Sequence, residues 1–216
     1  MSSRGEGEPV ARDLEVAMMT TKKMTKGRLE AFSDGVIAII ITVMVLELKV
    51  PHGDDLSALR VLAAPFAAYV LSFLHVGIYW NNHHHLLART ELVNGKVLWA
   101  NLNFLFWLSL MPVTTAWMGE TRLAPVPTAL YGFDLFLAGV SYFVLGRVLV
   151  RNQGPRSPLA QLIGSDTKGR LSTGLYAVAV PVACAHPRLA AAIYALVALM
   201  WFIPDRRLES YEALPP

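Results

Sequence analysis

The feature that most constrains this chain is a series of long apolar stretches. Crossing the hydrocarbon core of a bilayer, roughly 30 Å thick, takes about 20 helical residues, and turn-forming segments divide the sequence into six stretches near that length. With 54% hydrophobic and 16% charged residues, the composition is that of an all-α integral membrane protein. We expect spans near residues 29–49, 60–81, 93–118, 127–150, 171–186 and 188–204.

The two ends of the chain are polar, and the last two spans are short. Residues 1–27 are basic and lack the apolar core of a signal peptide, so we expect a disordered cytoplasmic tail. A six-helix domain then covers 28–205, and 206–216 form a second cytoplasmic tail. Pro181 falls inside the fifth span, so an interfacial or re-entrant segment is the alternative there.

The basic residues predict the orientation of the spans. Of the 19 lysines and arginines, fifteen fall on one side of a six-span arrangement, and four fall on the other: Lys49, Arg60, Arg122 and Arg188. Such a bias places the basic side, and with it both termini, in the cytoplasm. The same bias explains the net charge of +3, so no nucleic-acid partner is expected. The single Cys184 cannot form an internal disulfide.

The first span combines a polar start with a uniform apolar body. Arg28, Ser33 and Asp34 precede the run GVIAIIITVMVL, in which the only polar side chain is a threonine. Polar groups at the start of a membrane helix need partners, whether a helix terminus, Arg28 or a neighbouring helix. Such a stripe of aliphatic residues with one hydroxyl lines a narrow pore or packs against a neighbour. Helical spacing puts these residues on one stripe: Gly35, Ile39, Thr42, Val43 and Leu46.

A specific order of residues extends from this span into the second. The pattern RxxxFSDGVxAI opens the first span. The residues concerned are Arg28, Phe32, Ser33, Asp34, Gly35, Ala38, Ile39, Thr42, Leu46, Glu47 and Leu48, then Tyr69, Ser72, Phe73, Trp80, His83 and His84. In these positions the chain resembles the bacterial branch of the endosomal/lysosomal potassium channel family (transmembrane protein 175), with the detailed match over about residues 28 to 90.

The resemblance implies both an assembly and an activity. Bacterial members carry one six-span repeat and assemble as homotetramers in the lipid bilayer of the cell (plasma) membrane. They are cation channels without the TVGYG filter, a motif that is also missing here. The implied function is therefore a potassium-preferring channel with no enzymatic activity and no cofactor, in which potassium is the permeant ion.

The resemblance also implies roles for individual residues. The first helix would line the pore, with Ile39 at the hydrophobic constriction, Val43 and Leu46 as the next rings, and Thr42 as the hydroxyl that assists selectivity. Val43 departs from the leucine expected at its position. We expect a structural polar network that holds the first helix, formed by Arg28, Phe32, Ser33, Asp34, His75, Trp80 and Asn101. Within it, the partner of His75 is expected to be Ser33, Asp34 or Asn101.

Elementary physics agrees with this mechanism and leaves alternatives open. Four identical helices around an axis turn every stripe residue into a ring, and aliphatic rings gate by dewetting. Ordinary packing of the stripe against a neighbour is the alternative. A different function is a proton-conducting channel or proton-coupled transporter using Asp34, His75 and Asp134. A metalloenzyme built on 83–85 is disfavoured, because three adjacent histidines point to three faces of a helix.

Overall fold

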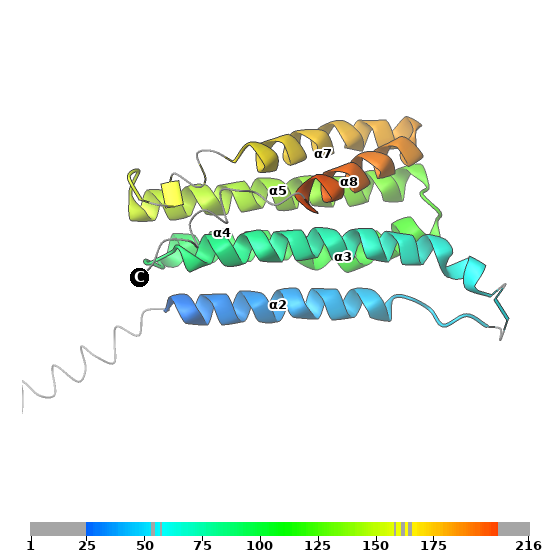
Figure 1. Ribbon diagram of the computed structural model, residues 1–216, viewed down its shortest axis with the longest axis horizontal. Coiled ribbons are helices and arrows are strands. Elements are labelled where there is room, and N and C mark those ends of the chain that lie inside the picture. Colours follow the sequence, from blue (N-terminus) through cyan, green and yellow to red (C-terminus); the bar gives the residue numbers. More distant parts are fainter. Residues whose placement is uncertain are drawn as a thin grey trace, which may run out of the picture.

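The computed structural model describes residues 25–52, 55–56, 58–157, 159–160, 163 and 166–202. Within them the chain is all-α, as the sequence predicts, and the helices run side by side along the long axis of the molecule (Figure 1). The six helices of this part are α2 (Lys26–Leu46), α3 (Leu59–Ala88), α4 (Gly95–Glu120), α5 (Pro125–Gln153), α7 (Thr167–Ala185) and α8 (Pro187–Phe202).

Four of these helices, α2 to α5, are long and apolar enough to cross a membrane. The last two are shorter, with 19 residues in α7 and 16 in α8, and they lie together along one side of α5 (Figure 1). Each stretch expected from the sequence coincides with one helix. The largest difference is at the end of α3, which continues to Ala88 instead of ending near residue 81.

Local chemistry sets several helix boundaries. At the start of α4 the Asn94 side chain accepts a hydrogen bond from the backbone N–H of Val97, at 3.1 Å. At the start of α7 Asp166 does the same for Gly169, at 2.8 Å. Both are N-caps, which satisfy backbone donors that the first helical turn leaves free. Helix α8 starts with Pro187, whose missing N–H costs nothing at that position.

Helix α7 is continuous through its proline. Pro181 lies inside it, where it removes one backbone hydrogen bond without ending the helix. The helix ends only at Ala185, and His186 then takes an irregular conformation with φ −135° and ψ 71°. This residue precedes a proline, and prolines disfavour the helical conformation in the residue before them. The fifth and sixth stretches are therefore a pair of packed helices.

Helix α2 lies at one edge of the bundle, packed against α3 and α4. On the side of α4 away from α2, α5 packs against α4, α7 and α8. Aromatic rings fill the core between α3, α5, α7 and α8. His75, Tyr131, Tyr176 and Tyr194 meet there with ring centroids 5.5 to 6.3 Å apart. The edge position of α2 leaves one of its faces without a partner among the described residues.

Close packing of α4 on α3 requires a glycine at position 119. A Cβ atom added there would lie 2.8 Å from the Cα atom of Pro65 and 3.2 Å from Ala68 Cβ, so the backbone itself would have to move. We expect Gly119→Ala to lower the free energy of unfolding by about 1–3 kcal/mol. Gly77 is the matched control, because a Cβ atom there meets nothing within 4 Å and alanine favours the helix.

Thermal unfolding of the two variants in the same detergent is the measurement. The prediction is wrong if Gly119→Ala melts at or above the temperature of Gly77→Ala.

Candidate functional site

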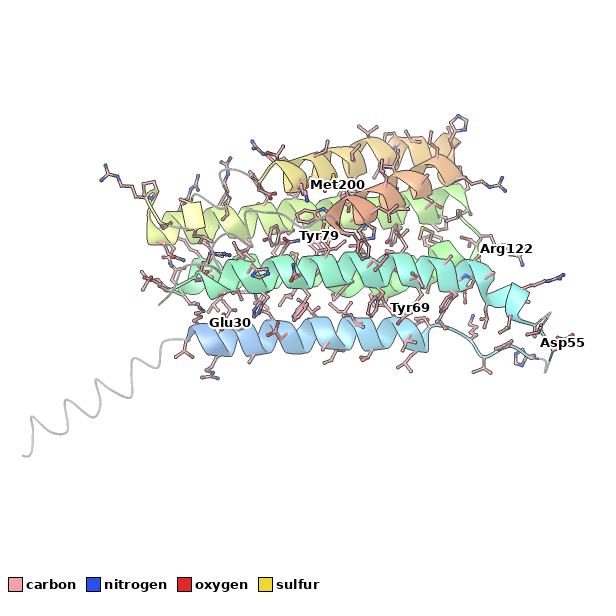
Figure 2. All side chains as sticks on the ribbon, viewed as in Figure 1. Glu30, Asp55, Tyr69, Tyr79, Arg122 and Met200 are labelled. Carbon is pink, nitrogen blue, oxygen red and sulfur yellow. The ribbon has the colours of Figure 1, made fainter. Side chains whose placement is uncertain are left out.

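One face of α2 is exposed over nearly its whole length. Ile39 is 62% exposed and Leu46 is 78% exposed, and Gly35 and Thr42 on the same stripe are exposed as well. Side chains along the free edge of α2 project away from the other helices (Figure 2). The opposite face is buried against α3 and α4 and includes Ile40, which is only 4% exposed. Helix α2 therefore presents a continuous apolar stripe to its surroundings.

The stripe expected from helical spacing is thus exposed, except at one position. Val43 is half-buried, at the margin of the exposed face. Thr42 lies near the centre of that face, and its hydroxyl donates to the carbonyl oxygen of Ile39 at 2.9 Å. A hydroxyl oxygen has two acceptor lone pairs. Thr42 therefore keeps an oxygen on the exposed face that can accept from water or coordinate a cation.

A buried hydrogen-bond chain ties α2 to α4 and α3. The Asn101 amide nitrogen donates to Ser33 Oγ at 2.9 Å, and Ser33 Oγ donates to the carbonyl oxygen of Leu29 at 2.8 Å. Asn101 Oδ1 lies 2.7 Å from Nε2 of His83. Ser33, Asn101 and His83 are each at most 1% exposed. We call these three residues the buried polar chain.

A second link lies beside this chain. The indole N–H of Trp80 donates to Oδ1 of Asp34 at 3.0 Å, and the ring of His84 stacks on Trp80 with centroids 6.0 Å apart. Phe32 is half exposed, on the free face of α2. The Arg28 side chain is exposed and makes no hydrogen bond or ion pair with another residue of the described ranges. Of the expected network, Ser33, Asp34, Trp80 and Asn101 are therefore joined to neighbours by hydrogen bonds.

His75 does not join this network, contrary to the expectation from sequence. Its Nδ1 atom lies 2.9 Å from the carbonyl oxygen of Leu71 and 3.3 Å from the hydroxyl of Tyr131 on α5. His83 takes the place expected for His75 beside Asn101. The reason is geometric, because eight helical residues separate the two histidines by about 12 Å along α3.

The acidic and histidine side chains that proton transport or a metal site would need do not lie together. Asp34 bonds Trp80, whereas Asp134 accepts from the hydroxyl of Thr114 at 3.1 Å, and His75 has the separate partners given above. The adjacent histidines 83 to 85 also diverge, with one in the buried polar chain and one on Trp80. No cluster of metal-binding side chains occurs in the described part of the chain.

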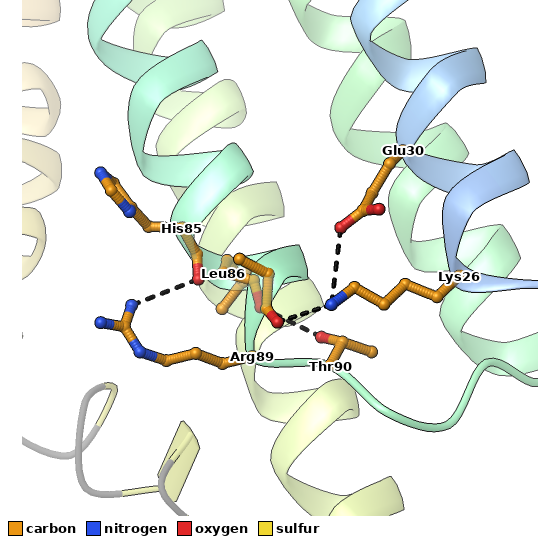
Figure 3. A network of polar contacts seen from close by, with 7 residues as sticks. Lys26, Glu30, His85, Leu86, Arg89 and Thr90 are labelled. Atoms are coloured by element: carbon orange, nitrogen blue, oxygen red, sulfur yellow. Dashed lines mark hydrogen bonds and ion pairs between the residues drawn. The ribbon is translucent and has the colours of Figure 1, made fainter. Parts of the chain in front are cut away.

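Charged side chains hold both ends of α2 in place, and nothing in the sequence indicated either contact. At the first end Lys26 Nζ donates to the carbonyl oxygen of Ala88 at 2.6 Å and lies 3.8 Å from Glu30 (Figure 3). Just beyond the last turn Lys49 pairs with Glu120 at the end of α4. A hydrogen bond to the Glu120 carboxylate, together with its charge, raises the pKa of Lys49 above its usual value.

The start of α2 is thus held by the two contacts of Lys26 and by the buried polar chain, whose Ser33 lies about two turns along the helix. All these partners come from α3 and α4 or from α2 itself. The arrangement positions one face of α2 and leaves the other face free. It contains no constellation for acid–base or nucleophilic chemistry within the described residues.

Comparison with known proteins identifies the family. A sequence model of the endosomal/lysosomal potassium channel TMEM175 matches residues 28–112, which cover α2, α3 and most of α4. A potassium channel of Chryseobacterium sp. (strain P1-3) is 50% identical over 186 residues, which are 86% of this chain and 97% of that protein. A potassium channel of Streptomyces collinus (strain DSM 40733 / Tue 365) is 31% identical over 88% of this chain and 98% of its own length.

A solved structure has the same fold. It is the crystal structure of a lysosomal potassium-selective channel TMEM175 homolog from Chamaesiphon minutus, with a TM-score of 0.74 and 26% sequence identity. The match covers 84% of this chain and 97% of the other. The family and these relatives are ion channels rather than enzymes. The present chain is therefore a multi-pass membrane protein that belongs to the TMEM175 family of ion channels.

Proposed function

We propose that this chain forms a homotetrameric, potassium-preferring cation channel whose pore is lined by α2. The observation that carries the proposal is the exposed apolar stripe of α2, on a helix whose other face is fixed by α3 and α4. A single chain supplies only one wall, so several copies have to surround an axis. The relatives named potassium channels support the choice of ion.

In this channel Ile39 forms the narrowest hydrophobic ring, and Leu46 forms a second ring about two turns farther along. Val43 contributes a ring between them from the margin of the exposed face. Aliphatic rings block ions by excluding water, so a cation passes only when the ring is wide enough to stay hydrated. The chain lacks TVGYG, and selectivity then depends on ring diameter and on the Thr42 oxygen. Discrimination is accordingly moderate.

The orientation follows from the charges at the two ends of the bundle. Lys26 and Arg28 start α2, and Arg147 and Arg151 end α5, so all four belong to one end. This end faces the cytoplasm by the positive-inside rule. Both termini then lie in the cytoplasm and the channel sits in the plasma membrane.

Subunit assembly is tested by crosslinking. In the background Cys184→Ser, Leu46→Cys is expected to form intersubunit crosslinks with a short bismaleimide, because Leu46 is exposed on the proposed pore face. Ile40→Cys is the matched control, since Ile40 is buried within its own subunit. An amine-reactive crosslinker on the native protein in mild detergent should give a ladder ending at four chains. A dominant monomer or dimer, or equal crosslinking at both cysteines, contradicts the proposal.

Conduction is tested by recording from purified protein in planar bilayers. Under a potassium gradient without a proton gradient, we expect currents that reverse near the potassium equilibrium potential. A proton-coupled transporter would carry no current under these conditions. A current that follows only the proton gradient would overturn the proposal of a potassium-preferring pore.

A further inference from the structure

A cavity of about 280 Å³ lies on the side of the bundle away from α2, between α3, α5, α7 and the end of α8. Its walls include six aromatic side chains, among them Tyr79, which lies between α3 and α5 (Figure 2). Arg170, Gly174 and Ala177 on its α7 side are exposed. A molecule dissolved in the surrounding lipid can therefore enter it. None of the residues proposed to line the pore belongs to it.

Three hydroxyl groups of the walls are already engaged as donors. Tyr79 donates to the carbonyl oxygen of Leu135 at 3.2 Å, and Tyr142 donates to that of Asn82 at 3.1 Å. Ser172 likewise donates to a carbonyl of its own helix, at 2.8 Å. These three hydroxyl groups therefore have no proton left to donate to a ligand.

His75 is different. It lines the cavity and is 2% exposed, and its Nε2 atom is buried without a hydrogen-bond partner among the described residues. Nδ1 lies 2.9 Å from the carbonyl oxygen of Leu71, which can only accept, so Nδ1 carries the proton. In the neutral imidazole Nε2 is then an acceptor. A buried acceptor without a partner is unusual, and here the ring that carries it lines a space large enough to hold one.

We propose that this cavity binds a small, uncharged, mostly apolar molecule with one hydrogen-bond donor, of the phenol type, and that the donor is held by His75 Nε2. The size is suitable, because an apolar cavity of about 150 Å³ already holds benzene. The charged side chains of the lining, Asp166 and Arg170, both lie at the start of α7. A charged ligand would therefore meet no opposite charge beside His75. This inference does not depend on conduction or on the number of subunits.

Binding is measured by fluorescence quenching in lipid nanodiscs. The probes are 4-bromophenol and 4-bromoanisole, which differ in whether the oxygen carries a proton or a methyl group. Bromine quenches tryptophan on contact, and Trp201 is the tryptophan in the cavity lining. Concentrations are expressed in the lipid phase, because the anisole partitions more strongly. Trp201→Phe gives the background quenching of the other four tryptophans.

For the unaltered protein we expect saturable quenching, with 4-bromophenol binding roughly two- to tenfold more tightly than 4-bromoanisole, as one net hydrogen bond predicts. His75→Leu should lower the affinity for the phenol to that for the anisole. Equal affinities for the two probes in the unaltered protein would overturn the proposal, and that comparison needs no variant. Discrimination that survives in His75→Leu would also overturn it.

A second pair of variants tests the place of binding. Gly174→Phe should abolish the saturable quenching by both probes, because Gly174 lines the cavity and a Cβ atom there meets nothing within 4 Å. Val178→Phe is the matched control one turn along α7, where the side chain is exposed and outside the lining. We expect it to bind both probes normally. Unchanged binding in Gly174→Phe, or equal losses in the two variants, would exclude this cavity as the site.

Discussion

Replacing Ile39 with asparagine is expected to raise the single-channel potassium conductance and to weaken discrimination against sodium. The isoleucine side chains exclude water from the narrowest ring and thereby block ions. The polar amide of asparagine lets water fill the ring, so the barrier to ion passage falls. Every 1.4 kcal/mol removed from that barrier raises the rate of passage about tenfold, and the substitution changes all four side chains of the ring at once. We therefore expect a gain of at least about tenfold. Recordings in symmetric potassium and then in mixed potassium and sodium measure both quantities.

Ile40→Asn is the control for this experiment. Ile40 is adjacent in sequence but 4% exposed, facing α3 and α4, so its replacement acts on packing. Single-channel conductance is measured only on assembled channels. It therefore separates an effect on the pore from a loss of packing and assembly. Ile40→Thr is a milder version if the asparagine variant does not assemble. If the Ile39 and Ile40 variants both gain conductance, or neither does, the narrowest ring lies elsewhere.

Removing the central member of the buried polar chain is expected to have the largest effect on assembly. Asn101→Ala leaves His83 Nε2 and one acceptor site of Ser33 without partners, and each unpaired buried group costs roughly 1–3 kcal/mol. We expect a large loss of folded protein by size-exclusion chromatography and a lower thermal midpoint. The selectivity of the channels that remain should be unchanged, because none of these side chains is on the exposed face of α2.

Asn103→Ala is the matched control, two residues along the same helix. Its amide also makes one hydrogen bond, to Ser141 Oγ at 2.8 Å, but Asn103 is exposed, and the buried Ser141 hydroxyl can bond a backbone carbonyl of its own helix instead. A much smaller loss is expected, well below 1 kcal/mol. Equal losses in the two variants, or altered ion preference with normal assembly in Asn101→Ala, would contradict the structural role of the chain.

The helices were predictable because a membrane span has a length and composition that few other structures share. Polar groups limited this reasoning at the end of α3. Asn81, Asn82 and the three histidines suggested the end of a span, yet α3 continues through them to Ala88. The helix continues because one of those histidines is buried against Asn101 and another stacks on Trp80. These are contacts between helices, which periodicity within one helix does not reveal.

The candidate site was likewise predictable only in part. The free stripe of α2 follows from helical spacing, because position around a single helix depends on that helix alone. The partner of a buried polar residue depends on how far two helices slide along each other. His75 therefore had several candidate partners, and a shift of about 12 Å along α3 separates it from His83, which bonds Asn101. The Lys26 contact with the Ala88 carbonyl was hidden for a further reason, since a backbone oxygen carries no signal in the sequence.

The order in which the ribosome delivers the helices gives the buried polar chain a consequence for biosynthesis. Its three members lie on α2, α3 and α4, which are synthesised consecutively, so Ser33, His83 and Asn101 can find one another before α5 exists. The polar groups around Ser72 have to wait, because their partner Tyr131 belongs to α5. An early three-helix unit thus enters the bilayer with this set of buried polar groups already satisfied. The helices of that unit carry the segment that the family model recognises.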